Sequence, residues 1–463
     1  MASMTTMNRF SQSMLALALI LIGGCSMMPR QPDLERLYST ARENVEQPPV
    51  IIIPGLMGTQ LESDSDGQIW PGSVLGLVFS DYRHAALEID PETLQPDPGD
   101  VRPGAIAGKF AGRSFYQPII DTLENVGGFE RVQAGTPVDP GGRYYYIYTY
   151  DWRLDNVESV RGLSRLVEQI RADHGQPDMK VDIIGHSMGG MIARYYLRYG
   201  TTDVTEDNRF PVNYHGADRV RRIVILGTPN MGSVESMNAF IAGRRIGLRR
   251  IPPEVMLTFP SFYQLFPHPL TQWLVDIQGR PFGLDPFDIS TWKRFRWSLF
   301  NPELRAGIVE NHDDAAQGRQ RLELLERYFK KHIERGRRFM WSLTVEMQRR
   351  PWELVVFGGD CELTPARVVV EPDGGRYHFR LRPGEIDSRR QGVDYNRLML
   401  EPGDGLVTKT SLLARQTLDP FVPRHKWSDF PIDYPLFLCE NHSQLTSNIF
   451  FQDNLLQFLL SRD

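Results

Sequence analysis

The chain has 463 residues, which is enough for one large domain with insertions or for two domains. Hydrophobic residues make up 41% and charged residues 24%, the balance of an ordinary globular protein, which argues against long disordered tracts. The formal net charge is -5, from 52 basic and 57 acidic residues, so the overall charge gives no basis for nucleic-acid binding.

The N-terminal residues 1–25 resemble a bacterial lipoprotein signal peptide. Arg9 is the only charge before the apolar run MLALALILIGG, which ends in two glycines directly before Cys25. Because this run is short for a transmembrane helix, we expect residues 1–25 to be a signal peptide that ends at a lipid-modified Cys25. A plain signal peptide or a short anchor is the alternative. Ser26 favours the outer membrane of a bacterial envelope, and residues 26–47 are typical of a polar tether.

Short runs rich in β-branched and aromatic residues predict the strands of a mainly parallel sheet. Their near-continuous apolar character indicates burial on both faces. The runs are 49–55, 143–152, 180–187, 220–229 and 352–359.

Helical periodicity separates several of these strands. Apolar residues recur at three- or four-residue spacing in 155–175, and again between Ser187 and Gly200. The C-terminal segment 447–463 is typical of a closing amphipathic helix. Strands that alternate with helices predict the α/β class.

Two long stretches do not follow this alternation, and we interpret them as insertions. The predicted core comprises 48–231, with an insertion at about 62–142, and 351–463. Between these parts, 232–350 is predicted to be a cap or lid insertion, with a helical pattern at 318–338. Loops at the carboxyl edge of an open α/β sheet are where ligand sites form.

The sequence Gly185-His186-Ser187-Met188-Gly189 lies between a predicted strand and a predicted helix. A Gly-x-Ser-x-Gly pattern alone is weak, but strand, tight turn and helix are the context of a nucleophile elbow. The N-terminus of the helix favours negative charge that develops at the reacting oxygen. We therefore predict Ser187 to be a nucleophile on an α/β-hydrolase fold with large cap insertions.

A serine nucleophile needs a base and an acid, which follow it in the order acid then base in this fold. His442 is the last of ten histidines and lies in a polar segment before the closing helix, so it is the predicted base; His425 is the rival. Asp360, after a late strand, and Asp404, in a glycine-flanked turn, are both candidates for the acid. The physical pattern alone leaves the choice between them open.

Cys361 and Cys439 are the two cysteines outside the signal segment. In an oxidising compartment such a pair forms a disulfide, with two free buried thiols as the alternative. No metal-ligand spacing or nucleotide-binding loop is visible, so we expect no metal and no cofactor.

Arginine-rich runs occur near 243–250 and 335–350. Such runs are usually a solvated face, although they also contact anionic lipid.

Six elements occur in the order and context of one known family: PVIIIPGLMGTQLES, YDWRLDN, GHSMGG, LGTPNMGS, GDGLVTKTSL and NHSQL. By these elements the chain resembles the lecithin:cholesterol acyltransferase family, which includes lysosomal phospholipase A2 and phospholipid:diacylglycerol acyltransferases. In that family the acid lies in a Gly-Asp-x-Thr-Val turn, so the resemblance implies Asp404 rather than Asp360. Leu406 replaces the usual threonine, and Asn230-Met231 stands where animal members tend to have Trp-Gly.

The resemblance implies a serine-dependent lipid acyl hydrolase or acyltransferase. Ser187, Asp404 and His442 would form the triad, with the backbone N–H groups of Leu56 and Met188 as the oxyanion hole. The substrate would be a phospholipid or another long-chain ester in a membrane, and water or a lipid alcohol would take the acyl group. A general esterase and a non-catalytic surface-binding protein are the alternatives.

Overall fold

The computed structural model describes most of the chain beyond the predicted signal peptide. The described residues are 31–43, 47–65, 67–71, 82–107, 109–110, 113–246, 249–312, 314–419, 421–423, 426 and 428–461. Cys25 and His425, two residues singled out in the sequence, lie outside the described residues.

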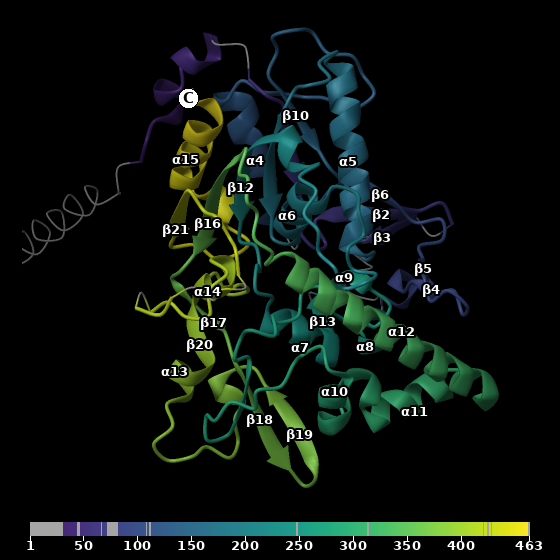
Figure 1. Cartoon of the computed structure of the whole chain (residues 1–463). Helices are drawn as coiled ribbons and strands as arrows, with labels where there is room; N and C mark the ends of the chain where they lie inside the picture. Colours follow the sequence, from purple (N-terminus) through teal and green to yellow (C-terminus); the bar gives the residue numbers. More distant parts are fainter. Residues whose placement is uncertain are drawn as a thin grey trace, which may run out of the picture.

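A seven-stranded sheet forms the centre of the molecule, in the upper half of Figure 1. Its order is β21-β16-β12-β11-β1-β10-β9, and every neighbouring pair is parallel. The strands are β1 (Val50–Ile53), β9 (Glu130–Arg131), β10 (Tyr144–Ile147), β11 (Val181–His186), β12 (Val220–Leu226), β16 (Glu353–Gly359) and β21 (Tyr434–Leu438). The prediction of an α/β fold with a parallel sheet is therefore confirmed.

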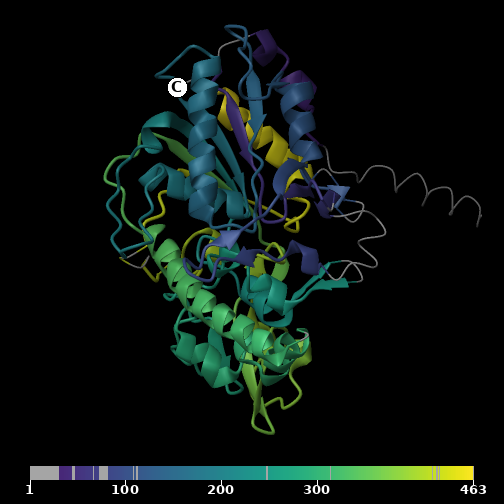
Figure 2. The same ribbon diagram turned by 90° about the vertical axis from the view of Figure 1, so that its right-hand side faces the viewer.

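Helices cover both faces of this sheet, which explains why the strands are apolar on both sides. Successive residues of β1 point to opposite faces: Ile51 and Ile53 pack in one core cluster, and Val50 and Ile52 in the other. The first face is covered by α5 (Asn156–Asp173) and α6 (Met188–Tyr199), and the second by α4 (Gln117–Asp121) and α15 (Ile449–Leu460). Figure 2 shows these helix layers around the sheet.

The segments between β12 and β16 form a cap, which occupies the lower half of Figure 1. Its elements are α7 (Val234–Ala242), β13 (Arg244–Ile246), β14 (Arg249–Ile251), α8 (Pro253–Met256), α9 (Pro260–Tyr263), β15 (Leu274–Asp276), α10 (Ile289–Phe295), α11 (Pro302–Glu310) and α12 (Ala315–Ser342). The later hairpin of β18 (Val368–Asp373) and β19 (Arg376–Arg380) joins β15 in a small sheet. The cap therefore includes chain from both sides of β16.

Shorter elements complete the fold. Before β10 they are α2 (Leu34–Leu37), β2 (Thr59–Ser63), β3 (Gly67–Trp70), β4 (Glu88–Ile89), β5 (Pro96–Asp97), β6 (Arg102–Ile106), β7 (Lys109–Phe110) and β8 (Arg113–Ser114). After β16 they are β17 (Glu362–Pro365), α13 (Tyr395–Met399), β20 (Leu400–Gly403) and α14 (Lys409–Leu412). The predicted insertion 62–142 also supplies core elements, since β9 pairs with β10 and α4 packs on the sheet.

The long helix α12 ties the cap to the sheet domain. The Arg335 guanidinium lies 3.0 Å from carboxylate oxygens of both Asp155 and Asp203, which belong to the sheet domain. One basic residue of the arginine-rich run 335–350 is therefore a structural link rather than part of a solvated face. Across the described parts of the chain, no helix combines the length and apolar character that a membrane crossing requires.

His332, on the same helix, gives a test of this packing through pH. Burial lowers the pKa of His332 to about 3, although nearby Asp155 opposes the shift. Below the ordinary histidine pKa the unfolded chain therefore binds a proton that the folded chain does not bind, so stability decreases as the pH is lowered. When the pH is lowered from about 7 to about 5, we expect His332 to decrease the free energy of unfolding by about 2 kcal/mol. Urea titrations at both pH values should show a weaker pH dependence in His332→Gln; an equal dependence in both proteins would contradict the assignment.

Candidate active site

Ser187 lies on the tight turn between β11 and α6. The strand ends at His186 and the helix begins at Met188, so the turn consists of Ser187 alone, with φ 51° and ψ -121°. A positive φ is strained for a residue with a side chain, and such strain gathers at functional sites. The Ser187 N–H donates to the Leu226 carbonyl at 2.8 Å, which fixes the turn against β12.

Close backbone contacts explain the glycines on the helical side of this turn. A Cβ atom added to Gly189 would lie 2.3 Å from the Ile53 carbonyl oxygen, and one added to Gly190 would lie 2.1 Å from Thr228 Oγ1. Only glycine lets α6 begin this close to β1 and β12. The strand, strained serine and helix at the centre of a parallel sheet identify the α/β-hydrolase fold.

His442 and Asp404 form a directly bonded pair. His442 Nδ1 lies 2.8 Å from Asp404 Oδ2, and the His442 N–H donates to the Asp404 carbonyl at 2.8 Å. Asp404 is 2% exposed, and its Oδ1 accepts the backbone N–H groups of Leu406 and Val407 at 3.0 and 2.7 Å. These hydrogen bonds fix the orientation of the carboxylate, so that its other oxygen faces one nitrogen of the imidazole ring.

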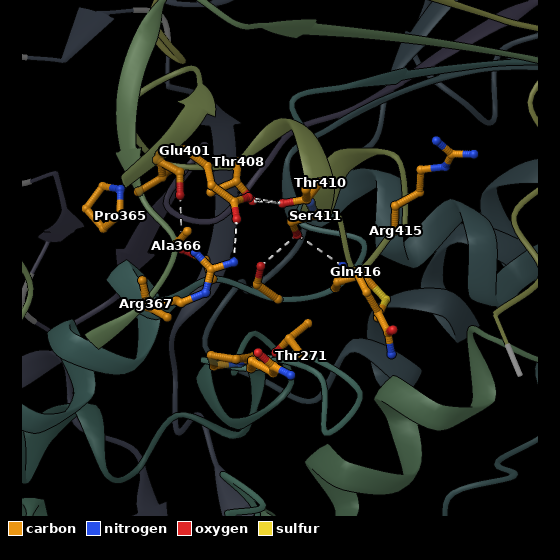
Figure 3. Close-up of a pocket in the computed structure, with 17 residues that line it drawn as sticks. Thr271, Pro365, Ala366, Arg367, Glu401, Thr408, Thr410, Ser411, Arg415 and Gln416 are labelled. Atoms are coloured by element: carbon orange, nitrogen blue, oxygen red, sulfur yellow. Dashed lines mark hydrogen bonds and ion pairs between the residues drawn. The ribbon is translucent and has the colours of Figure 1, made fainter. Parts of the chain in front are cut away.

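The turn that carries Asp404 is held by a two-stranded antiparallel sheet and a polar network. Strand β20, which ends at Gly403, pairs with β17, and the Gly405 N–H donates to Thr364 Oγ1 at 2.8 Å. A pocket of about 50 Å³ lies beside this turn and is lined by Leu406 and Thr408. Figure 3 shows its polar side chains, among which Glu401 accepts hydrogen bonds from Arg367 and Thr410. The network fixes the chain on both sides of the acid turn.

Asp360 has a different partner from Asp404. Its carboxylate lies 2.8 Å from Lys409 Nζ, so the geometry pairs the rival acid with a lysine and not with His442. Next to it, Cys361 is joined by a disulfide to Cys439, with Cα atoms 5.0 Å apart. The disulfide links the chain after β16 to the segment between β21 and His442.

Ser187, Asp404 and His442 all line one cavity of about 420 Å³ at the carboxyl ends of the strands. Much of its wall is apolar and comes from residues far apart in the sequence: Leu56, Met57, Trp70, Ala107, Phe115, Ile246, Leu265, Leu406 and Val407. Trp70 is 2% exposed and contacts Trp152 edge-on, so it both packs in the core and faces the cavity. Such a concave, mainly apolar site with a few polar groups is typical of a ligand pocket.

Leu56 and Met188 are the residues predicted to form the oxyanion hole. Leu56 lines the same cavity as Ser187, and a Cβ atom added to its neighbour Gly55 would lie 2.7 Å from the Ser187 Cβ. Met188 follows Ser187 as the first residue of α6, where the first N–H groups have no acceptor within the helix. The role of these two N–H groups as oxyanion donors stays a prediction.

Tyr116 is a site residue that the sequence did not indicate, because no motif surrounds it. Its hydroxyl accepts the Gly55 N–H at 2.8 Å and lies 2.9 Å from His186 Nδ1. Burial and the nearby His442 hold the pKa of His186 well below its ordinary value, so the His186 ring is neutral, and its Nδ1 shares a hydrogen bond with the Tyr116 hydroxyl. Tyr116 thus joins the loop of Leu56 to the residue before Ser187.

Asp151 and Arg153 of the YDWRLDN element form a buried ion pair at 2.7 Å, which gives these two residues a structural role. In the described part of the chain, no group of His, Cys, Asp and Glu side chains is placed to hold a metal ion.

One family profile matches part of the chain. Residues 143–279 match the lecithin:cholesterol acyltransferase family. The matched span includes Ser187 and ends before Asp404 and His442. No curated protein sequence matches the chain significantly.

Solved structures resemble the chain in fold. The structure of the Tle4–Tli4 complex is similar with a TM-score of 0.54 and 15% identity, over 89% of this chain and 98% of that chain. Staphylococcus hyicus lipase has a TM-score of 0.36 and 12% identity, over 94% and 98% of the two chains. Bacillus licheniformis lipase BlEst2 in mature form has a TM-score of 0.34 and 11% identity, over 90% and 93%. At these identities the likeness concerns the fold alone.

Tyr116→Phe tests the link between the Leu56 loop and the serine turn. The variant removes the acceptor of the Gly55 N–H and the hydrogen-bond partner of His186 Nδ1, so we expect kcat for a soluble p-nitrophenyl ester to fall about tenfold. The melting temperature should be measured alongside, because a loss of activity at an unchanged melting temperature separates local positioning from unfolding. An unchanged kcat would show that the loop keeps its position without this hydroxyl.

Proposed function

We propose that this protein is a serine acyl hydrolase of lipid esters, which forms an acyl-serine intermediate and passes the acyl group to water or a lipid alcohol. The observation that carries the proposal is the bonded Asp404–His442 pair in the same largely apolar cavity as the strained Ser187 turn. The match of residues 143–279 to the acyltransferase family supports the same class of reaction.

In the proposed first half-reaction, Ser187 attacks the ester carbonyl. A bond forms from Ser187 Oγ to the carbonyl carbon while the hydroxyl proton passes to His442 Nε2. Asp404 accepts the hydrogen bond from Nδ1–H, which leaves Nε2 free to take the proton and stabilises the resulting imidazolium. The bond from the carbonyl carbon to the alcohol oxygen then breaks, and the leaving alcohol takes the proton from His442.

The second half-reaction repeats these steps with a new nucleophile. His442 takes a proton from water or a lipid alcohol, which attacks the acyl carbonyl and releases Ser187. In both halves the Leu56 and Met188 N–H groups would bind the oxyanion, and such a donor contributes about 3 to 4 kcal/mol to the transition state. Which acceptor reacts depends on how well the closed site excludes water.

The cavity wall supports a lipid rather than a small polar ester. Apolar side chains from the Leu56 loop, the Trp70 region and the cap surround the triad, so a long acyl chain would be desolvated on binding. A lipid modification at Cys25 would hold the enzyme at a membrane that contains such substrates, and we propose a bacterial outer-membrane location on this basis.

Substitution of the triad tests the proposed chemistry. In the full chain in detergent micelles, we expect Ser187→Ala and His442→Ala to reduce the release of fatty acid from phosphatidylcholine by roughly 10⁴-fold, and Asp404→Asn by a similar factor. Asp360→Asn is the matched control, because Asp360 is a neighbouring carboxylate that pairs with Lys409. It should retain most of the activity.

In this assay, mass spectrometry of free fatty acid and of new ester, with and without an added sterol, measures acyl transfer to water and to the sterol separately. Ester that rises with the sterol would identify a transferase, and fatty acid alone a hydrolase. Activity that survives in Ser187→Ala would refute the nucleophile. Activity in the wild type toward short soluble esters only would favour a general esterase.

Cys25→Ser tests the proposed anchor. With labelled palmitate in a bacterial host, we expect the wild type to incorporate label and to sediment with the outer membrane in a density gradient, because an acylated N-terminus binds the bilayer. The variant should incorporate no label. Equal labelling, or a wild type that remains in the periplasmic fraction, would exclude lipidation at this cysteine.

A further inference from the structure

Arg244 places a positive charge in the wall of the cavity that contains Ser187 and His442. It is the first residue of β13, directly after α7. Strand β13 pairs with β14 in a short antiparallel hairpin of the cap, in which Arg244 lies opposite Ile251. Alternate residues of a strand point to the same face, and Ile246, which shares the face of Arg244, is buried and also lines the cavity.

The Arg244 guanidinium has no bonded partner in the described part of the chain, where it makes neither a hydrogen bond nor an ion pair. Its nearest acidic influence is Glu235, but that carboxylate lies 2.8 Å from the Arg382 guanidinium. Burial lowers the pKa of Arg244, with Glu235 opposing the shift. A guanidinium that is partly withdrawn from water without a bonded anion is costly, and a bound anion would remove that cost.

The other charged groups of the cavity wall do not supply an anion for Arg244. Asp404 is engaged by His442 and by two backbone N–H groups. Arg245, the next residue, adds a second positive charge to the wall. The wall therefore combines an apolar surface, a serine nucleophile and excess positive charge. A ligand that fits this combination has an acyl chain, an ester and an anionic group close to the ester.

We propose that Arg244 binds the phosphodiester of a glycerophospholipid whose acyl ester lies at Ser187, an inference that rests on the proposed hydrolase function. In such a lipid the short glycerol backbone separates the acyl ester from the phosphodiester. Arginine matches this ligand because its planar fork donates two parallel hydrogen bonds to phosphate oxygens. A diacylglycerol has the same acyl esters without the anion, so it would leave Arg244 unpaired.

The test compares these two lipids in the full chain. Phosphatidylcholine and diacylglycerol with identical acyl chains are presented in the same neutral detergent micelles, and kcat and KM are measured for each. In Arg244→Gln we expect the ratio of kcat/KM for phosphatidylcholine over diacylglycerol to fall at least about tenfold, mainly through KM, because a charge-assisted contact is lost. Arg244→Lys keeps the positive charge without the planar fork, so its ratio of kcat/KM should lie between those of the wild type and Arg244→Gln.

Arg249→Gln is the matched control, since Arg249 is an exposed arginine on β14 that does not line the cavity. It should keep the wild-type ratio. An unchanged ratio in Arg244→Gln would overturn the inference, and so would a wild type that cleaves diacylglycerol at least as well as phosphatidylcholine; either result leaves the hydrolase proposal standing. A wild type that cleaves neither lipid would refute the hydrolase proposal itself.

A competition experiment distinguishes a lipid headgroup from free phosphate. Glycerophosphocholine and inorganic phosphate are added separately to the diacylglycerol assay. We expect glycerophosphocholine to inhibit the wild type more strongly than inorganic phosphate, and Arg244→Gln to lose this inhibition. Inhibition by inorganic phosphate alone would overturn the headgroup assignment.

Discussion

The close approach of α6 to β1 is the constraint on which the site depends. Because a side chain on Gly189 would collide with the Ile53 carbonyl, the turn at Ser187 and the loop that follows β1 lie together only when this position is glycine. The positive φ of Ser187 costs about 1 to 3 kcal/mol, which the buried strands on either side of β11 offset. The same packing brings the loop of Leu56 and the N-terminus of α6 to the cavity that contains Ser187.

The acid and the base reach this turn from later parts of the chain, and separate devices fix them. The antiparallel pairing of β17 with β20 and the Thr364 hydroxyl position the Asp404 turn, whereas the disulfide at Cys439 restrains the segment that leads to His442. His442 is bonded to Asp404 through both its ring and its backbone N–H. The acid and base thus form one rigid unit, and only its placement against Ser187 depends on the rest of the sheet.

The central strands were predictable from sequence because burial on both faces leaves a continuous apolar run, as in Val50–Ile53. Two edge strands gave no such signal: β9 has only two residues, both exposed, and β21 contains Pro435 and is half-exposed. The predicted strand 143–152 ends at Ile147 in the structure. Ser187, Asp404 and His442 lie in recognisable local patterns, and Arg244 lies in an arginine-rich run, although the run does not indicate which arginine faces the cavity. Tyr116 reaches the site through contacts between distant segments, which no local pattern records.

The neutral state of His186 matters for the proposed chemistry. Its ring lies 5.0 Å from the His442 ring between centroids, so a charge on His186 would repel the imidazolium that forms when His442 takes the serine proton. Burial keeps His186 neutral, and the Tyr116 hydroxyl occupies its Nδ1. The ring beside the nucleophile therefore adds no opposing charge, and Asp404 remains the ionised group bonded to His442. A second histidine beside the proposed base is compatible with turnover only when it is uncharged. Here the contact with the Phe115 ring and the buried hydrogen bond with Tyr116 provide the environment that keeps His186 neutral.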